Sequence, residues 1–263
     1  MSGKLLLAVI MTGICLVPYV ARADFDAATN FSPTSNPNGV WSYGWTQTLG
    51  SSFILDAIHE NSFDLDFWEG SIETDSPPGF FPTVFHNGSD NTITYFDTLS
   101  VAPGQLGLHP GPDGQYGVVR FTAPTDGTYS IDSAFIGLDF GGPFFERSTT
   151  TDVHVLVNEA SIFDGVVNDF GSGPSFSVLR TLQAGDMIDF AVGSGDGNYF
   201  NDSTGLAAQV SVVPEPVSVI MLCTGLVGML SYAGCRRRRS PDVSNWTLIR
   251  CAWLLGPRTR IRK

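Results

Sequence analysis

The sequence predicts an all-β domain, an antiparallel sandwich or barrel, for the segment from Asp24 to Val212. Short stretches of alternating apolar and polar residues recur in its second half between Gly, Pro and Asp turns. No window of the segment has a sustained 3.6-residue apolar period, which a helix would require. All 19 Phe of the chain lie inside it, so the segment has enough apolar side chains to form a packed core.

The chain begins with a predicted secretory signal, residues 1–23. An apolar run from Leu5 to Val20 follows a lysine, and the small residues Ala21 and Ala23 stand where a signal peptidase cuts. We expect cleavage before Asp24. An uncleaved N-terminal anchor is the alternative, and the Ala-x-Ala pattern favours cleavage.

The strands of the exported segment are predicted from period-two alternation. Three are expected in the first half, at Ser52–Ala57, Phe63–Phe67 and Asn91–Phe96. Two loops are expected, at Asp75–Pro82 and Leu106–Gly114. Six further strands are expected in the second half, at Tyr116–Thr122, Thr128–Ile136, Thr151–Asn158, Ser175–Leu182, Asp186–Val192 and Leu206–Val212.

The exported segment is strongly acidic and lacks cysteine. Residues 24–212 contain 24 acidic residues and only three basic ones, Arg120, Arg147 and Arg180, so their net charge is −21. Such a domain repels nucleic acid and anionic lipid headgroups, so neither is an expected partner. All four Cys lie outside it, so its stability needs no disulfide, and a cysteine nucleophile or thiolate metal site is excluded there.

The C-terminal part, residues 213–239, predicts a membrane anchor. An apolar stretch at 217–235 would reach about 28 Å as a helix, roughly the thickness of a bilayer core. The arginines that follow would stay on the cytoplasmic side, so residues 24–212 would lie outside the inner membrane. The charged and proline residues that frame the stretch are Pro214, Glu215, Pro216, Arg236, Arg237, Arg238 and Arg239.

In this order, the Pro-Glu-Pro triplet, the single span and the basic stop resemble the PEP-CTERM sorting signal of Gram-negative bacteria. The resemblance implies a membrane processing enzyme, exosortase, as partner, and a destination at the cell surface or in extracellular polysaccharide. An ordinary C-terminal anchor with a proline-rich stalk is the alternative. Residues 240–263 depart from the family pattern, because its chains usually stop soon after the arginines. We expect a basic cytoplasmic tail or an extension without a role.

A second resemblance covers the second half of the exported segment. Val119 to Pro124, with Gly127-Thr128-Tyr129, looks like the opening hairpin of jelly-roll carbohydrate-binding modules. Leu182 to Phe190 looks like their late turn and strand, and Asp202-Ser203-Thr204 stands where such modules carry polar residues before the last strand. The resemblance implies a jelly-roll-like sandwich, and fold alone does not imply sugar binding.

Two groups of residues are candidates for ligand or metal binding. Trp41, Tyr43 and Trp45 alternate, so in a strand they would share one face, which either stacks on sugar rings or packs into the core. The oxygen-rich loop after Val192 would suit a structural calcium ion, although turns need the same residue types. Its candidate ligands are Asp196, Asn198, Asn201 and Asp202.

No catalytic motif is evident, so we predict a protein that is not an enzyme. The four His are scattered, and we expect Asp152 and His154 to form a solvated pair on the outer face of a strand. The predicted function is a non-catalytic, polysaccharide-binding or matrix component of the cell surface, with no certain cofactor. The alternatives are a small polysaccharide-active enzyme and a purely structural matrix protein.

Overall fold

The computed structural model describes residues 24–70, 81–141 and 147–214, together with 225, 228–230 and 232. The chain divides into two units, Met1–Pro214 and Glu215–Lys263. The predicted signal, the basic tail, and all of the sorting signal except residues 213, 214, 225, 228–230 and 232 lie outside the described residues. Within the predicted span, the described residues are helical, and the described part of the chain contains no helix both long and apolar enough to cross a bilayer.

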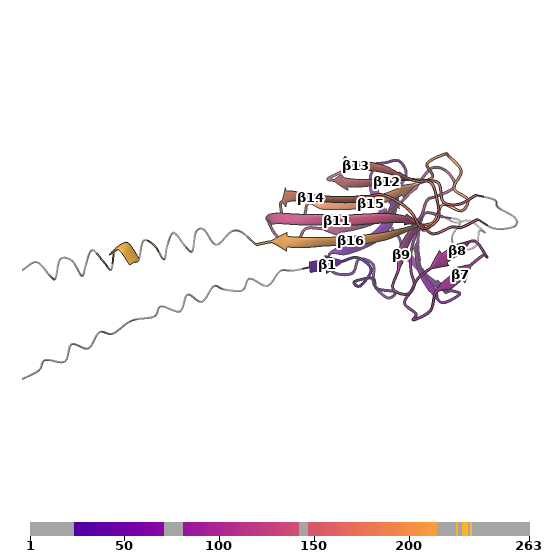
Figure 1. The fold of residues 1–263 in the computed structure, drawn as a ribbon, viewed down its shortest axis with the longest axis horizontal. Coiled ribbons are helices and arrows are strands. Elements are labelled where there is room, and N and C mark those ends of the chain that lie inside the picture. Colours follow the sequence, from indigo (N-terminus) through magenta and orange to yellow (C-terminus); the bar gives the residue numbers. More distant parts are fainter. Residues whose placement is uncertain are drawn as a thin grey trace, which may run out of the picture. The chain divides into compact units, whose positions relative to one another are not determined.

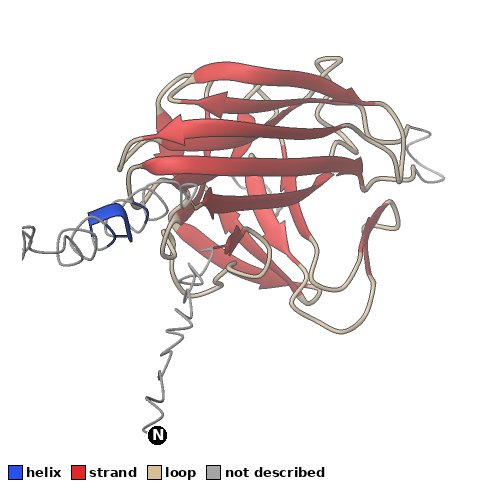
Figure 2. Ribbon diagram, turned by 60° about the vertical axis from the view of Figure 1, so that its left-hand side comes forward, coloured by secondary structure: helices blue, strands red, loops and turns tan. Residues whose placement is uncertain are grey.

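The first unit is a two-sheet antiparallel sandwich (Figures 1 and 2), which confirms the predicted all-β class. The larger sheet, here sheet A, runs in the order β14 (Ser175–Leu182), β11 (Gly127–Gly137), β16 (Thr204–Val213), β9 (Leu106–His109), β6 (Thr83–His86), β5 (Leu65–Glu69) and β4 (Ile58–Ser62), with β1 (Asp24–Asp26) also paired to β16. Sheet B runs in the order β13 (Ala160–Val167), β12 (Thr151–Val157), β15 (Met187–Gly193), β10 (Tyr116–Thr122), β2 (Trp41–Thr46) and β3 (Phe53–Leu55). A separate hairpin consists of β7 (Ile93–Tyr95) and β8 (Leu99–Val101).

From β9 onward, successive strands alternate between the sheets, except at the β12–β13 hairpin. This alternation brings strands from both sheets together around one core. The assignment of these strands to different sheets also contradicts one prediction, that of a hairpin. The segment from Val119 to Tyr129 is not a hairpin, because β10 belongs to sheet B and β11 to sheet A. The predicted loop at Leu106–Gly114 was also wrong in its first part, which forms β9.

The main core lies between the two sheets. Valine and aromatic side chains at alternate positions of β10, β12 and β15 meet those of β11 and β16, and most are fully buried. Trp41 and Tyr43 of β2 belong to this core with no exposed surface. Their alternation therefore arises from packing between sheets, as expected for a half-buried strand whose apolar face points inward.

A second, smaller core lies on the opposite face of sheet A. Period-two alternation sends Trp68 of β5 and Val84 of β6 into the main core, so that Phe67 and Phe85 point to the other side. The β7–β8 hairpin covers these rings with Tyr95, Leu99 and Val101, all buried, and Figure 1 shows the hairpin at the end of the sandwich opposite the arrowhead of β16. This second core forms the floor of the site described next.

Candidate functional site

A pocket of about 510 Å³ opens where the β7–β8 hairpin, sheet A and the β15–β16 loop (residues 194–203) meet. Six of its side chains are aromatic rings other than histidine, and the remainder are mostly polar groups. The volume lies in the range of small-molecule sites, about 300–1,000 Å³. The lining residues are Phe67, Thr83, Phe85, Tyr95, Phe96, Thr98, Leu99, His109, Asp139, Tyr199, Phe200, Asn201 and Ser203.

Backbone contacts hold the three walls together. Ser100 N donates to the carbonyl of Leu138 at 3.0 Å, which ties β8 to the segment that follows β11. Leu138 N in turn donates to the carbonyl of Ser203 at 3.0 Å, which ties that segment to the β15–β16 loop. The segment at Leu138–Asp139 therefore fixes the relative positions of the hairpin and the loop.

Asp139 supplies the carboxylate of the pocket. It is 2% exposed, and its Oδ2 accepts the Ser203 N–H at 2.7 Å. Burial raises the pKa of this carboxyl to about 6, although the backbone N–H of Ser203 and the hydroxyls of Ser203 and Thr98 favour the charged form. Asp139 is thus mostly ionised at neutral pH.

His109, at the end of β9, is buried against the same pocket. Its Nδ1–H donates to the carbonyl of Pro110 at 2.7 Å, and burial lowers the pKa of the ring to about 4. The imidazole is therefore neutral at physiological pH, and its Nε2 is the acceptor nitrogen of that tautomer. The neighbouring Thr83 hydroxyl is fully buried and has no hydrogen-bond partner. The base of the pocket thus combines one carboxylate with two uncharged polar groups.

Two pairs of rings stand over this polar base. Tyr95 and Phe96 of the hairpin lie with ring centroids 4.4 Å apart, and Tyr199 and Phe200 of the loop lie 4.4 Å apart as well. Phe96 is 61% exposed and Phe200 is 42% exposed. Exposed aromatic rings beside a cavity are unusual on a monomer surface and mark a binding site more often than a solitary apolar residue does.

The aromatic residues predicted for ligand binding do not form this site. Trp41 and Tyr43 are wholly buried between the sheets, so of the two alternatives the core face holds for them and the sugar-stacking face does not. Trp45 is half-buried on the same strand. The sequence alternation correctly indicated a shared face, but that face is the inward one.

The predicted calcium loop forms turn contacts. Asp196 pairs with Arg147 and accepts the Asn198 N–H at 2.9 Å, and Asn201 donates its Nδ2–H to the Arg147 carbonyl. Asp202 is fully buried and accepts the N–H and the hydroxyl of Thr150 at 2.9 and 3.0 Å. A guanidinium beside the loop disfavours a cation, and no group of three or more His, Cys, Asp or Glu among the described residues is suited to a metal. The structure favours the turn over the calcium site.

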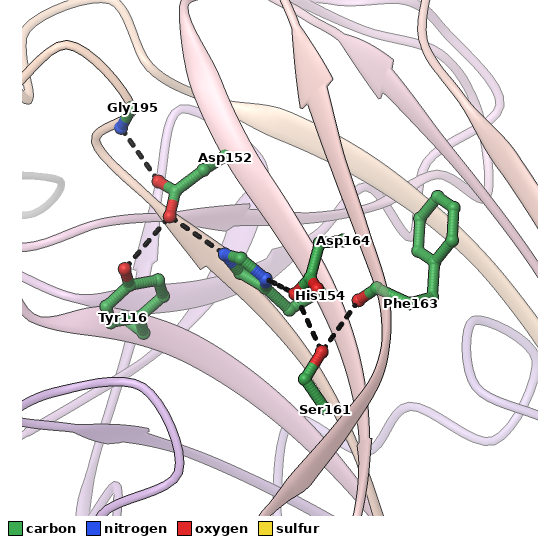
Figure 3. Close-up of polar contacts among 7 residues, drawn as sticks. All are labelled: Tyr116, Asp152, His154, Ser161, Phe163, Asp164 and Gly195. Atoms are coloured by element: carbon green, nitrogen blue, oxygen red, sulfur yellow. Dashed lines mark hydrogen bonds and ion pairs between the residues drawn. The ribbon is translucent and has the colours of Figure 1, made fainter.

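A polar network on the outer face of sheet B contains Asp152 and His154 (Figure 3). The expected solvated pair is wrong, because His154 is 9% exposed and both ring nitrogens are engaged. Nε2 lies 2.8 Å from Asp152 Oδ2, and Nδ1 lies 2.6 Å from Asp164 Oδ1 on β13. Burial lowers the pKa of the ring, but the two carboxylates outweigh burial and raise it above the usual value.

The rest of the network fixes the two carboxylates. Tyr116 donates to Asp152 Oδ2 at 2.9 Å, and Gly195 N donates to Oδ1 at 2.8 Å. Ser161 donates to Asp164 Oδ1 at 2.7 Å, so its hydroxyl is not a free nucleophile. Because each ring nitrogen faces a carboxylate oxygen, neither is available to a substrate, so His154 is not placed to act as a general base. The network is therefore a structural clamp across three strands of sheet B.

Comparisons with known proteins find only distant structural similarity. No family model matches it, and no curated protein matches it. A family 51 carbohydrate-binding module (CBM51) from Clostridium perfringens GH95, solved with methyl-galactose, is 15% identical, with a TM-score of 0.32 over 53% of this chain and 94% of that chain. A family 35 module from Clostridium thermocellum is 13% identical, with a TM-score of 0.25 over 58% and 95%. Rabbit GITRL is 14% identical, with a TM-score of 0.25 over 38% and 73%. The similarity is distant and identifies neither family nor ligand.

Proposed function

We propose that this chain is an exported surface protein whose β-sandwich binds a polysaccharide through the pocket beneath the β7–β8 hairpin. The proposal depends mainly on one observation: aromatic rings and buried polar groups line the same cavity. Ring faces pack against the C–H faces of a sugar, while Asp139, His109 and Asn201 offer acceptors and donors for its hydroxyls. Within the described part of the chain, Asp139 is the one carboxylate that lines the pocket, and glycoside hydrolysis generally needs two. Binding without catalysis is therefore the better-supported activity.

The proposed route to the surface comes from the sequence. The signal at residues 1–23 would export the domain, and the Pro-Glu-Pro triplet with its apolar span and arginines would retain it in the inner membrane until an exosortase processes it. Extracellular polysaccharide would then be the material that the domain meets. A polysaccharide is thus the ligand expected both from the proposed compartment and from the aromatic and polar lining of the pocket.

The test is a binding measurement on the purified full chain against an array of bacterial and plant oligosaccharides, followed by calorimetry on those that bind. Phe200→Ala should weaken binding about fivefold, because one stacked ring contributes on the order of 1 kcal/mol. Phe170→Ala is the matched control, since Phe170 is 43% exposed, close to the 42% of Phe200, but does not line the pocket. Binding that is absent for every glycan, or that both variants weaken equally, would contradict the proposal.

A further inference from the structure

The charge balance of the pocket is unusual for a site that recognises only neutral sugars. Among the lining residues that the structure describes, Asp139 is the single ionised group at neutral pH, because His109 is neutral. No Lys occurs in residues 24–214, so the only permanent cations of the exported domain are its three arginines. The charge of Asp139 must therefore be balanced by an arginine, by the dipoles of neighbouring hydrogen-bond donors or by a ligand that binds in the pocket.

None of the arginines balances it. Arg120 holds Asp189 through two hydrogen bonds of 2.6 and 2.7 Å on sheet B. Arg147 pairs with Asp196, and Arg180 is exposed on β14. Asp139 is stabilised by neutral donors alone, and burial still disfavours its charged form. A buried carboxylate that has hydrogen bonds but no counter-ion is stabilised further when a cation arrives.

The walls of the pocket favour a cation as well. The faces of aromatic rings carry negative potential and attract ammonium groups, by about 0.5–2 kcal/mol for each good contact. Such rings line the pocket at Phe67, Phe85, Tyr95, Phe96, Tyr199 and Phe200. The net charge of −21 on residues 24–212 repels anionic ligands such as uronic acids and draws cations toward the domain.

We propose that the ligand of this pocket carries an ammonium group, as a de-acetylated amino sugar does, and that Asp139 is its counter-ion within the aromatic walls. This inference rests on the proposed polysaccharide binding and narrows it to a chemical class. Asp139 contacts the ammonium group, the rings surround its C–H substituents, and the neutral His109 and the unpaired Thr83 hydroxyl remain for sugar hydroxyls.

The experiment compares three oligosaccharides of equal length with the full chain, by calorimetry at about pH 6.5. They are a glucosamine oligomer, its N-acetylated counterpart and a neutral glucose oligomer. We expect the glucosamine oligomer to bind about tenfold more tightly than the other two, as one desolvated charge pair with a cation–π contact would give. Equal affinities for all three would overturn the ammonium proposal and leave polysaccharide binding intact. Absence of binding to all three would contradict both.

Variants separate the pocket from the general acidity of the domain. Asp139→Asn should abolish the preference for the glucosamine oligomer, whereas Asp90→Asn, which removes the same charge from an exposed loop position, should leave it unchanged. Equal effects of the two variants would overturn the proposal. Because Asp139→Asn also alters the bond to Ser203, a second measurement uses the unaltered chain. Tetramethylammonium chloride should displace the glucosamine oligomer more effectively than sodium chloride at the same concentration, and equal displacement would refute the aromatic ammonium site.

Discussion

Replacing His154 with glutamine should destabilise the sandwich, most strongly between about pH 4 and 6.5. The substitution keeps a polar side chain of similar size but removes the imidazolium that lies between Asp152 and Asp164. Two carboxylates on neighbouring strands would then lose their shared cation. The clamp joins β12 to β13 directly and reaches β10 through Tyr116, so its loss should loosen one edge of sheet B.

The expected magnitude follows from Asp152. Burial raises the pKa of its carboxyl, but hydrogen bonds from His154, Gly195 and Tyr116 outweigh burial and lower it from 3.8 to about 2. Each pKa unit corresponds to about 1.4 kcal/mol, so these contacts together stabilise the folded state by about 2 kcal/mol. The variant keeps the bonds from Gly195 and Tyr116, so in a domain of this size its melting temperature should fall by no more than about 4–8 °C.

The dependence on pH has a definite sign. The contribution of Asp152 is present above its unfolded pKa of 3.8 and disappears as the pH falls through about 2. The pKa of His154 is raised in the folded state, so its contribution is complete below the unfolded value of 6.5 and disappears as the pH rises through the raised value. Both contributions are complete together only between the two unfolded values, which defines the window of greatest effect.

Thermal melts followed by circular dichroism, at half-unit steps from about pH 3 to 9, would measure the effect. His59→Gln is the matched control, because His59 makes one contact with a carboxylate, Asp66, at 3.1 Å rather than two. The control should lose less stability than His154→Gln. Identical melting temperatures for His154→Gln and the unaltered chain near pH 5.5, or a difference that widens toward pH 9, would refute the reasoning.

Two further predictions concern the core and the sorting signal. Trp41→Ala should cost roughly 3–5 kcal/mol in the free energy of unfolding, measured by urea denaturation, because the indole is fully buried between the sheets; a loss below about 1 kcal/mol would mean that the strand is not packed as described. Replacing Pro214, Glu215 and Pro216 with alanine should leave an unprocessed, membrane-bound form in cell fractionation, because the prolines keep the triplet extended whereas three alanines could join the predicted helix; normal release of this variant to the surface would exclude exosortase sorting through the triplet.

The second half of the fold was predictable because its strands alternate clearly. Val153, Val155 and Val157 indicated one inward face of β12, and all three pack in or against the main core. Strand β13 was missed, because Ala160–Val167 mixes Ser, Asp and Gly with apolar residues at a sheet edge, where one side of the strand is free of pairing constraints. Strand β9 was mistaken for a loop because the glycines and prolines that follow it dominate the local pattern.

The pocket was not predictable from the sequence. Its walls come from β5, β6, the β7–β8 hairpin, the end of β9, the segment after β11 and the β15–β16 loop, and no local spacing relates these segments. Alternation also cannot tell an aromatic face that packs inward from one that meets solvent, which is why Trp41 was a candidate and Phe200 was not. One signal was available: Asp202-Ser203-Thr204 was singled out for its polarity before the last strand, and Ser203 is the residue that donates to Asp139.

Strand β16 links the loop that lines the pocket to the start of the C-terminal segment. The strand runs for ten residues, about 30 Å, from Thr204 beside the pocket to Val213 at the point where the C-terminal segment begins. Every one of those residues is paired with β11, from Gly137 opposite Thr204 to Thr128 opposite Val213. A load held in the pocket and a tether attached at Pro214 would therefore pull along the strand and stress this ladder in shear, with all of its bonds sharing the force, rather than unzipping them one at a time. Because β16 follows directly after Ser203, which lines the pocket, the strand would also transmit tension from that pocket to any tether.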